Sequence, residues 1–447
     1  MTHLLRSWFL SSIAALTAPA LQLSDTKDWP QWLGPQRDSV WRETGVISHV
    51  SDDSIKTVWR TPISRGYSGP SVIGNRVFVT DFVRQTGTIN NISSAKEKVA
   101  GHERVLCLDA TNGKILWIHS YPVEYEVSYP GGPRTSPAIS DDKVYTLGTD
   151  GDPYCLKAES GEVIWQKRFS EDYGADTPFW GHSAHPLVFD DTIVCMVGGK
   201  NAVVVAFDLN TGAERWTALT SKEPGYAPPT LAHFAGKPTL LVWHPESLNG
   251  LNPKDGSLRW SIALPANYGM SVTAPLVSGH RIYVSGIGTP PTLIHVSENG
   301  EAAEMAWQGG NRKGIVTGNS TPVIYDGVIY GVDTQGRLIA SSLFDGEQLW
   351  STYKATTGSR RQSYFTAFLV RNEDRFFIFN ENGSLVLAEL SENGYTELGR
   401  RSILNPTNDA YGRKVIWSHP AFAQLSLFAR NDKEIVRVSL AETNGNR

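Results

Sequence analysis

The residues best suited to recognise a ligand are aromatic, arginine and histidine side chains that gather ahead of regularly spaced, strand-like segments. Aromatic rings stack on planar groups, and arginine forms paired hydrogen bonds with anions. The same residue types also anchor protein interfaces. We interpret the following residues as candidates for binding a protein partner or a small planar, anionic or carbohydrate ligand: Tyr67, Tyr129, Arg134, Trp180, His182, His185, Tyr226, Tyr268, Asn319, Arg361, Tyr364, Tyr411, Arg413 and His419.

Two of these candidates, His182 and His185, lie three residues apart and raise the question of a metal site. His419 would supply a third ligand only if folding brought it close to them. A zinc site needs that third ligand and hydrogen-bonded partners behind it, so the spacing alone is weak support. We expect no metal. We also assign no catalytic residue, because neither a nucleophile motif nor a paired acid and base stands out.

A repeat spaces these candidates along the chain. Residues 105–117 read as an apolar strand, a glycine-containing turn and a second strand, with Trp117 four residues after Gly113. The spacing returns at Gly161 and Trp165, Gly212 and Trp216, Gly256 and Trp260, and Gly346 and Trp350, with weaker copies at Gly300 and Trp307 and at Gly394 and Leu398. We predict that the recurring indoles dock between neighbouring units; they are Trp59, Trp117, Trp165, Trp216, Trp260, Trp307 and Trp350.

A second signature begins each unit: a small or polar residue precedes proline, and an apolar strand follows. Proline suits the first position of a strand whose N–H faces no partner, as at an inner edge. The segment 363–370 fills one further slot without proline, which makes eight starts. The prolines are Pro70, Pro137, Pro186, Pro229, Pro275, Pro322 and Pro420.

Units of about 45 residues with four antiparallel strands are typical of propeller blades. The sequence therefore predicts an all-β, eight-bladed β-propeller, with seven blades as the alternative. The last unit has room for three strands, and residues 55–63 would supply its outer strand and close the ring. A solenoid or a pair of β-sandwiches would not keep the glycine-to-tryptophan spacing over the whole chain.

Residues 109–117 resemble the tryptophan-docking repeat of the pyrroloquinoline-quinone-like propeller family. That family includes quinoprotein dehydrogenases and the outer-membrane protein assembly factor BamB. The resemblance covers residues 55–440, and residues 28–35 resemble the N-terminal segment of secreted bacterial proteins with such repeats. In the dehydrogenases, the quinone lies on the axis with a calcium ion held by carboxylate and amide side chains, and an Asp acts as base.

This sequence departs from the dehydrogenases in several respects. No two cysteines are adjacent, and the loops show no evident set of calcium ligands, although Asn319, Glu223 and Asp409 are available. We therefore expect a non-catalytic binding or scaffold protein without a cofactor. The alternatives are a dehydrogenase that uses pyrroloquinoline quinone with calcium, and a carbohydrate-binding propeller.

The N-terminus reads as an export signal over residues 1–20, with Arg6, an apolar stretch and Ala18-Pro19-Ala20. We expect an N-terminal segment at 21–54, the propeller at 55–440 and a tail at 441–447, in a periplasmic or secreted monomer without a membrane span after cleavage. A net charge of −4 and no basic run argue against binding of nucleic acid. We expect the three cysteines to be buried and unpaired, and residues 85–103 to form a mobile loop.

Overall fold

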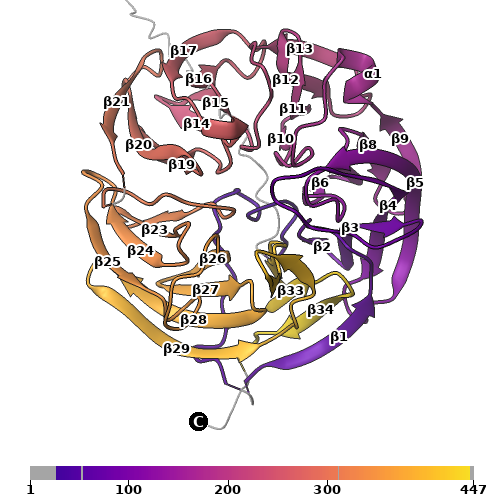
Figure 1. Ribbon diagram of the computed structural model, residues 1–447, viewed down its shortest axis with the longest axis vertical. Coiled ribbons are helices and arrows are strands. Elements are labelled where there is room, and N and C mark those ends of the chain that lie inside the picture. Colours follow the sequence, from indigo (N-terminus) through magenta and orange to yellow (C-terminus); the bar gives the residue numbers. More distant parts are fainter. Residues whose placement is uncertain (1–26, 52–53, 311, 443–447) are drawn as a thin grey trace, which may run out of the picture.

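Eight four-stranded antiparallel sheets surround one axis in the computed structural model (Figure 1). The structure describes residues 27–51, 54–310 and 312–442. Seven sheets use four strands that are consecutive in the chain, and the eighth combines strands from both ends of the chain. The all-β, eight-bladed propeller predicted from the repeat is therefore confirmed, and the alternative of seven blades is wrong.

The first four blades run in chain order from the innermost to the outermost strand. Blade 1 is formed by β2 (Ser71–Ile73), β3 (Arg76–Arg84), β4 (Glu97–Asp109) and β5 (Ile115–Val127). Blade 2 is formed by β6 (Ala138–Ser140), β7 (Lys143–Leu147), β8 (Pro153–Lys157) and β9 (Val163–Gln166). Blade 3 is formed by β10 (Leu187–Phe189), β11 (Thr192–Gly199), β12 (Ala202–Asp208) and β13 (Glu214–Ala218). Blade 4 is formed by β14 (Thr230–Phe234), β15 (Lys237–His244), β16 (Ser247–Leu251) and β17 (Leu258–Ala263).

The remaining blades follow the same plan until the ring closes. Blade 5 is formed by β18 (Leu276–Ser278), β19 (Arg281–Gly286), β20 (Thr289–Val296) and β21 (Ala303–Gln308). Blade 6 is formed by β22 (Val323–Tyr325), β23 (Val328–Val332), β24 (Leu338–Ser342) and β25 (Gln348–Thr352). Blade 7 is formed by β26 (Ala367–Asn372), β27 (Arg375–Asn380), β28 (Ser384–Ser391) and β29 (Gly394–Ser402). Blade 8 is formed by β32 (Ala421–Ala423), β33 (Ser426–Arg430), β34 (Glu434–Ser439) and β1 (Lys56–Pro62).

Blade 8 fastens the two ends of the chain to each other, as the sequence predicts. β1 pairs antiparallel with β34, with Arg60 opposite Val436. The fully buried Arg430 of β33 donates to the carbonyl oxygens of Ser64 and Thr80, which lie just after β1 and in blade 1. Main-chain pairing and a buried arginine therefore join the first and last strands of the ring.

At most seams between blades, the tryptophan of one blade lies against the next blade and bonds to it. The Nε1–H of Trp117 on β5 donates to the carbonyl oxygen of Ala158 in blade 2 at 3.0 Å. Its ring lies on Gly161, where an added Cβ would come within 2.6 Å of the indole and φ is +74°. Only glycine meets both conditions, because other residues avoid this φ and carry the clashing Cβ. Equivalent hydrogen bonds are made by Trp59, Trp165, Trp216, Trp307 and Trp350.

Trp260 of blade 4 is the exception among the predicted docking residues. Its Nε1 is buried without a hydrogen-bond partner, and its ring lies over Gly250 of its own blade. The nearest neighbour of Gly300, the corresponding turn glycine of blade 5, is Phe234. Trp260 shares a buried core cluster with Ile282 and Ile294 of blade 5, but it lacks the hydrogen bond that the other docking tryptophans make.

The N-terminal segment, residues 27–51, crosses the centre of the ring (Figure 1). Trp29 pairs with Val72 of β2, and the carbonyl oxygen of Pro30 accepts from Ile139 of β6. Farther along, Trp41 donates to Arg371 of β26 on the other side of the axis. The segment thus crosses from one side of the ring to the other and fills one end of the channel.

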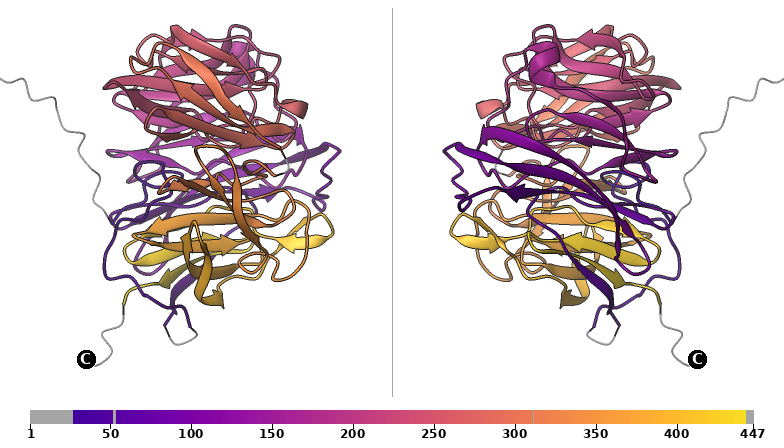
Figure 2. Two further views of the ribbon diagram at one scale, coloured as in Figure 1. Left: turned by 90° about the vertical axis from the view of Figure 1, so that its left-hand side faces the viewer. Right: turned by 90° about the vertical axis from the view of Figure 1, so that its right-hand side faces the viewer.

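Two hairpins project at the opposite end. Figure 2 shows the purple β4–β5 hairpin of blade 1 and the yellow hairpin of β30 (Asn408–Ala410) and β31 (Arg413–Val415) projecting from the same side of the disc. The side chain of Asn91 bonds to that of Asn408, which joins the two projections. The predicted loop at 85–103 is wrong for residues 97–103, which extend β4 because they pair with β5.

Three smaller expectations concern cysteines, the leader and membrane spans. The cysteines are free and buried, as predicted: Cys107, Cys155 and Cys195. The predicted export signal at 1–20 lies outside the described residues. Within the described ranges, no helix is long and apolar enough to cross a membrane. The helical elements include α1 (Phe169–Tyr173) and the 3-10 turn η1 (Asn267–Gly269).

Candidate binding cup at the open mouth

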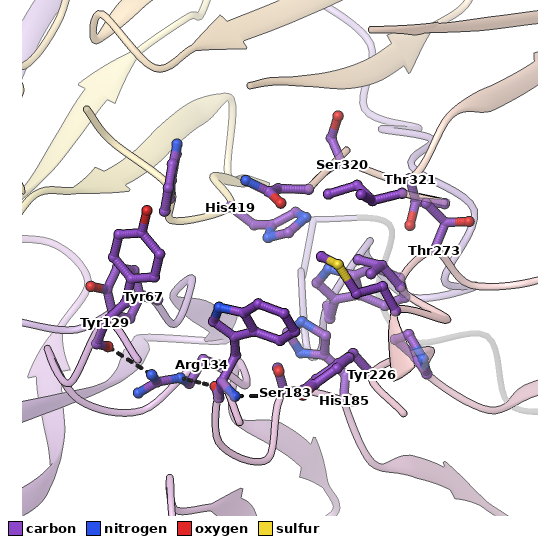
Figure 3. Close-up of a pocket in the computed structure, with 18 of the residues that line it drawn as sticks. Tyr67, Tyr129, Arg134, Ser183, His185, Tyr226, Thr273, Ser320, Thr321 and His419 are labelled. Atoms are coloured by element: carbon purple, nitrogen blue, oxygen red, sulfur yellow. Dashed lines mark hydrogen bonds between the residues drawn. The ribbon is translucent and has the colours of Figure 1, made fainter. Parts of the chain in front are cut away.

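The connections between blades surround a cavity of about 220 Å³ at the end of the channel opposite the N-terminal crossing. We call this cavity the cup. In Figure 3, Tyr67, Tyr129 and Arg134 lie on one side, and Thr273, Ser320 and Thr321 lie on the opposite side. Its lining consists of Trp32, Tyr67, Ser93, Tyr129, Arg134, Trp180, Ser183, His185, Tyr226, Pro228, Met270, Val272, Thr273, Ile287, Asn319, Ser320, Thr321, Tyr411, Trp417 and His419.

Trp32 of the N-terminal segment forms the floor of the cup with His185 and His419. The Trp32 ring stacks on His185 at 4.6 Å between centroids and meets His419 edge-on at 5.8 Å. The guanidinium of Arg37 lies over the Trp32 ring, 5.3 Å from its centroid, and donates to the carbonyl oxygen of Pro186. The floor is therefore closed by the chain itself.

Both floor histidines are neutral at physiological pH. Burial lowers the pKa of His419 to about 3, and burial together with the nearby His419 and Arg37 lowers the pKa of His185 well below its ordinary value. The Nδ1 atom of His185 accepts a hydrogen bond from the backbone N–H of Ser136 at 3.0 Å. Neither imidazole is therefore suited to exchange a proton near pH 7.

Arg134 is the charged residue of the lining, but its donors are already engaged. A guanidinium has five N–H donors. The five hydrogen bonds run to the carbonyl oxygens of Trp180, Gly132, Ser128 and Tyr129 and to the hydroxyl of Thr149. Its face lies 5.2 Å from the centroid of Tyr67. Arg134 therefore holds neighbouring loops in place and has no free pair of donors for an anion.

Aromatic rings form much of the remaining wall. Trp417 meets Tyr129 edge-on at 5.2 Å, and Trp180 meets Tyr226 edge-on at 5.6 Å. Burial raises the pKa of Tyr67 to about 12 and also raises the pKa of Tyr226, so both phenols stay protonated. The cup thus presents aromatic surfaces and neutral polar groups.

The structure brings nine of the predicted candidates together around the cup. They are Tyr67, Tyr129, Arg134, Trp180, His185, Tyr226, Asn319, Tyr411 and His419. Binding of a ligand by these residues remains a prediction, which their convergence supports.

Five candidates lie elsewhere. His182 is buried against Phe169, and burial lowers its pKa to about 4. Arg413 bonds to the buried Glu381, and Tyr364 stacks on the outer side of the cup against Tyr411 at 5.1 Å. Arg361 and Tyr268 are exposed, Tyr268 by 83%.

Trp32 is the main lining residue that the list of candidates omits. It belongs to a segment outside the repeat, so no periodic pattern in the sequence predicts that it lies on the axis. Trp417, Met270 and Ser320 belong to the same connections as the candidates, and the apolar Ile287 and Val272 carry no chemical signature.

The donor set of the cup does not fit a quinone with calcium. Calcium takes six to eight oxygen ligands, with carboxylates among them. Among the described residues that line the cup, none is Asp, Glu or Lys. Asn319 lines it, but Glu223 lies against Gly269 and Asp409 pairs with Lys414, both outside the lining. Among the described residues, no cluster of three potential metal ligands occurs either.

Fold and cup together define a β-propeller with a cavity at one end of a channel that the N-terminal segment closes. The sequence places it in a family: residues 101–286 and 200–439 match the family described as outer membrane protein assembly factor BamB. The chain belongs to this family. The resemblance found in the repeat is therefore confirmed.

Individual relatives are distant. The chain is similar to the outer membrane protein assembly factor BamB of Yersinia pestis, with 26% identity over 278 residues, 57% of this chain and 66% of that protein. It thus spans slightly less than two thirds of that relative. It is also similar to the quinohemoprotein alcohol dehydrogenase ADH IIB of Pseudomonas putida, with 26% identity over 165 residues, 36% of this chain and 22% of that enzyme.

The fold is also that of a solved quinoprotein. The structure superposes on the quinohemoprotein alcohol dehydrogenase of Comamonas testosteroni with a TM-score of 0.62 at 12% identity. The superposition covers 95% of this chain and 82% of the enzyme. At this identity the likeness concerns the propeller fold alone.

Proposed function

We propose that the protein is a BamB-like, non-catalytic scaffold of the bacterial cell envelope that binds a protein partner at the open mouth. The partner would belong to the assembly of outer membrane proteins, as the name of the Yersinia pestis relative indicates for that protein. The expected export signal agrees with an envelope location.

The observation that carries this proposal is the apolar rim around the cup. Tyr268 is 83% exposed, Ile92 is 52% exposed and Tyr411 is 43% exposed. Tyr411 lines the cup, and the other two lie within two residues of lining residues Met270 and Ser93. Exposed tyrosines beside an aromatic depression are typical of protein interfaces, where a few such residues supply most of the binding energy.

The chemistry of the cup favours binding over catalysis. General acid–base catalysis works best with a group whose pKa lies near the working pH. The floor histidines are held neutral, Arg134 is fully hydrogen-bonded and the described lining contains no carboxylate. These groups can pack and donate hydrogen bonds, but they are poorly placed to transfer protons.

Site-specific photocrosslinking tests the proposal. A photoreactive amino acid at Tyr268 or Tyr411 of the full chain is expected to give one dominant protein adduct in envelope extract. The control position is Leu258, which is 54% exposed on the outer strand β17 and should give none. Equal adducts at all three positions would contradict binding at the mouth. Stoichiometric uptake of pyrroloquinoline quinone with calcium, followed by dye-linked oxidation of an alcohol, would overturn the non-catalytic assignment.

A further inference from the structure

We propose that the cup itself binds an uncharged saccharide, as a free sugar or as the terminal unit of a glycan. This inference rests on the proposed role of the mouth as a binding site and names a ligand for its interior. Three observations carry it: the charge of the lining, the neutral groups that remain available, and the blind floor.

The charge of the lining excludes strong recognition of an ion. No described lining residue is Asp, Glu or Lys, and the five donors of Arg134 all bond to protein oxygens. A cationic ligand would lose its water here without gaining a counter-ion, and an anionic ligand would lose its water without a free N–H of Arg134 to bond it; both losses are costly in a partly buried site. An uncharged ligand avoids that cost.

The available groups match a hydroxylated ring. Trp180 and Trp417 expose aromatic surface on which the C–H face of a sugar can stack. Trp32 is 5% exposed, lines the cup and buries an indole N–H that lacks a partner. A buried donor without a partner costs free energy, so a ligand hydroxyl oxygen that reached this N–H would gain a favourable bond. Asn319 uses its Nδ2 in a 3.5 Å contact with Thr366, which leaves its carbonyl oxygen available.

The size and the blind floor favour one or two sugar units over a polypeptide chain. Cavities that enclose drug-sized ligands measure about 300–1,000 Å³, and the cup measures about 220 Å³. Because Trp32 and its neighbours close the floor, no chain can pass through the ring. The end of a glycan needs no exit.

Calorimetric titration of the full chain tests the inference. The probes are the neutral disaccharides maltose, cellobiose and N,N′-diacetylchitobiose, with digalacturonic acid as the anionic comparison and a proline-rich peptide as the protein-like comparison. A glycan array of neutral chains distinguishes a glycan terminus from a free sugar. We expect at least one neutral saccharide to bind at least about tenfold more tightly than the anionic probe.

Variants locate the binding. Trp180→Ala and Asn319→Ala are each expected to weaken saccharide binding about tenfold, and Leu258→Ala on the outer strand β17 should bind like the wild type. If Trp180→Ala fails to fold, Trp180→Phe and Asn319→Ala carry the test. Binding of the peptide alone, preference for the anionic probe, or no saccharide binding on the array would overturn the inference. The crosslinking experiment decides the scaffold role separately, because its adducts do not depend on a sugar.

Discussion

At the perimeter of the ring, one contact recurs from blade to blade: an indole lies on a glycine with positive φ and donates to a carbonyl oxygen of the next blade. At the floor of the cup the contacts are individual: Trp32 of the N-terminal segment meets His185 and His419, which come from two separate connections. The comparison teaches that repetition builds the frame, whereas the binding surface depends on single residues that break the repeat.

The largest effect is expected from removing the strand that joins the ends of the chain. Deletion of residues 55–63 leaves β34 without its outer partner. It also removes the strand that holds Ser64, whose carbonyl oxygen accepts from Arg430, in place. Because the ring then opens, we expect the melting temperature to fall by roughly 10 °C or more. Val58→Ala is the control, since Val58 is 46% exposed on the same strand. A deletion variant that melts with the wild type would refute the ring as the unit of stability.

The buried acid Glu103 predicts an unusual dependence of stability on pH. Glu103 is 1% exposed and accepts from the hydroxyl of Tyr121 and the N–H of Thr149. Burial raises its pKa from 4.5 to about 7. The folded state therefore binds the proton more tightly, so the contribution to stability is present below pH 4.5 and is lost as pH rises through 7.

Glu103→Gln isolates this effect. Denaturant unfolding at several pH values measures this. Between pH 4.5 and pH 8, the free energy of unfolding of the variant should rise by up to about 3 kcal/mol relative to that of the wild type. Asp152, whose pKa burial raises to about 6, is present in both proteins. Parallel stability curves for the two proteins would contradict the assignment of a buried, protonated Glu103.

Alanine substitutions at two glycines of the same backbone conformation distinguish the cost of backbone strain from the cost of a steric clash. Gly161 and Gly236 both have φ of +74°, but an added Cβ at Gly161 meets the Trp117 ring at 2.6 Å, whereas at Gly236 it meets nothing within 4 Å. Alanine at either position costs about 1 kcal/mol for the backbone. We expect Gly161→Ala to cost about 1–3 kcal/mol more in denaturant unfolding. Equal losses would show that the indole does not depend on that glycine.

The smallest effect concerns the hydrogen bond of a docked indole. Trp117→Phe removes the bond to Ala158 and should cost about 1 kcal/mol beyond the change in packing. Trp260→Phe removes an N–H that has no partner, so it should cost less or stabilise the protein. Denaturant unfolding of both variants measures the difference. A larger loss at Trp260 would contradict the contrast between an indole N–H with a partner and one without.

The frame could be predicted from the sequence because its determinants are local and repeated. Gly113 and Trp117 lie four residues apart, and each copy of that spacing marks one blade. The repeat does not indicate that Trp260, which keeps the same spacing, lacks the hydrogen bond, because the position of a carbonyl oxygen on the next blade has no signature in the sequence.

The cup could be predicted only in part, for a related reason. Its wall comes from connections marked by proline, so residues such as Tyr67 and Asn319 were found. Its floor comes from Trp32, which reaches the axis through contacts of the N-terminal segment with several blades. The engagement of Arg134 with five oxygens also depends on the folded loops and could not be foreseen from its type.

The pairing of β1 with β34 has a consequence for biogenesis. Arg60 and Glu434, which meet across it, are separated by 374 positions, so the earliest strand waits with a bare edge until nearly the whole polypeptide has been made. Such distant pairing slows folding and leaves partly folded intermediates prone to aggregate. Newly made chains are therefore prone to aggregate until the final strands have been synthesised and paired.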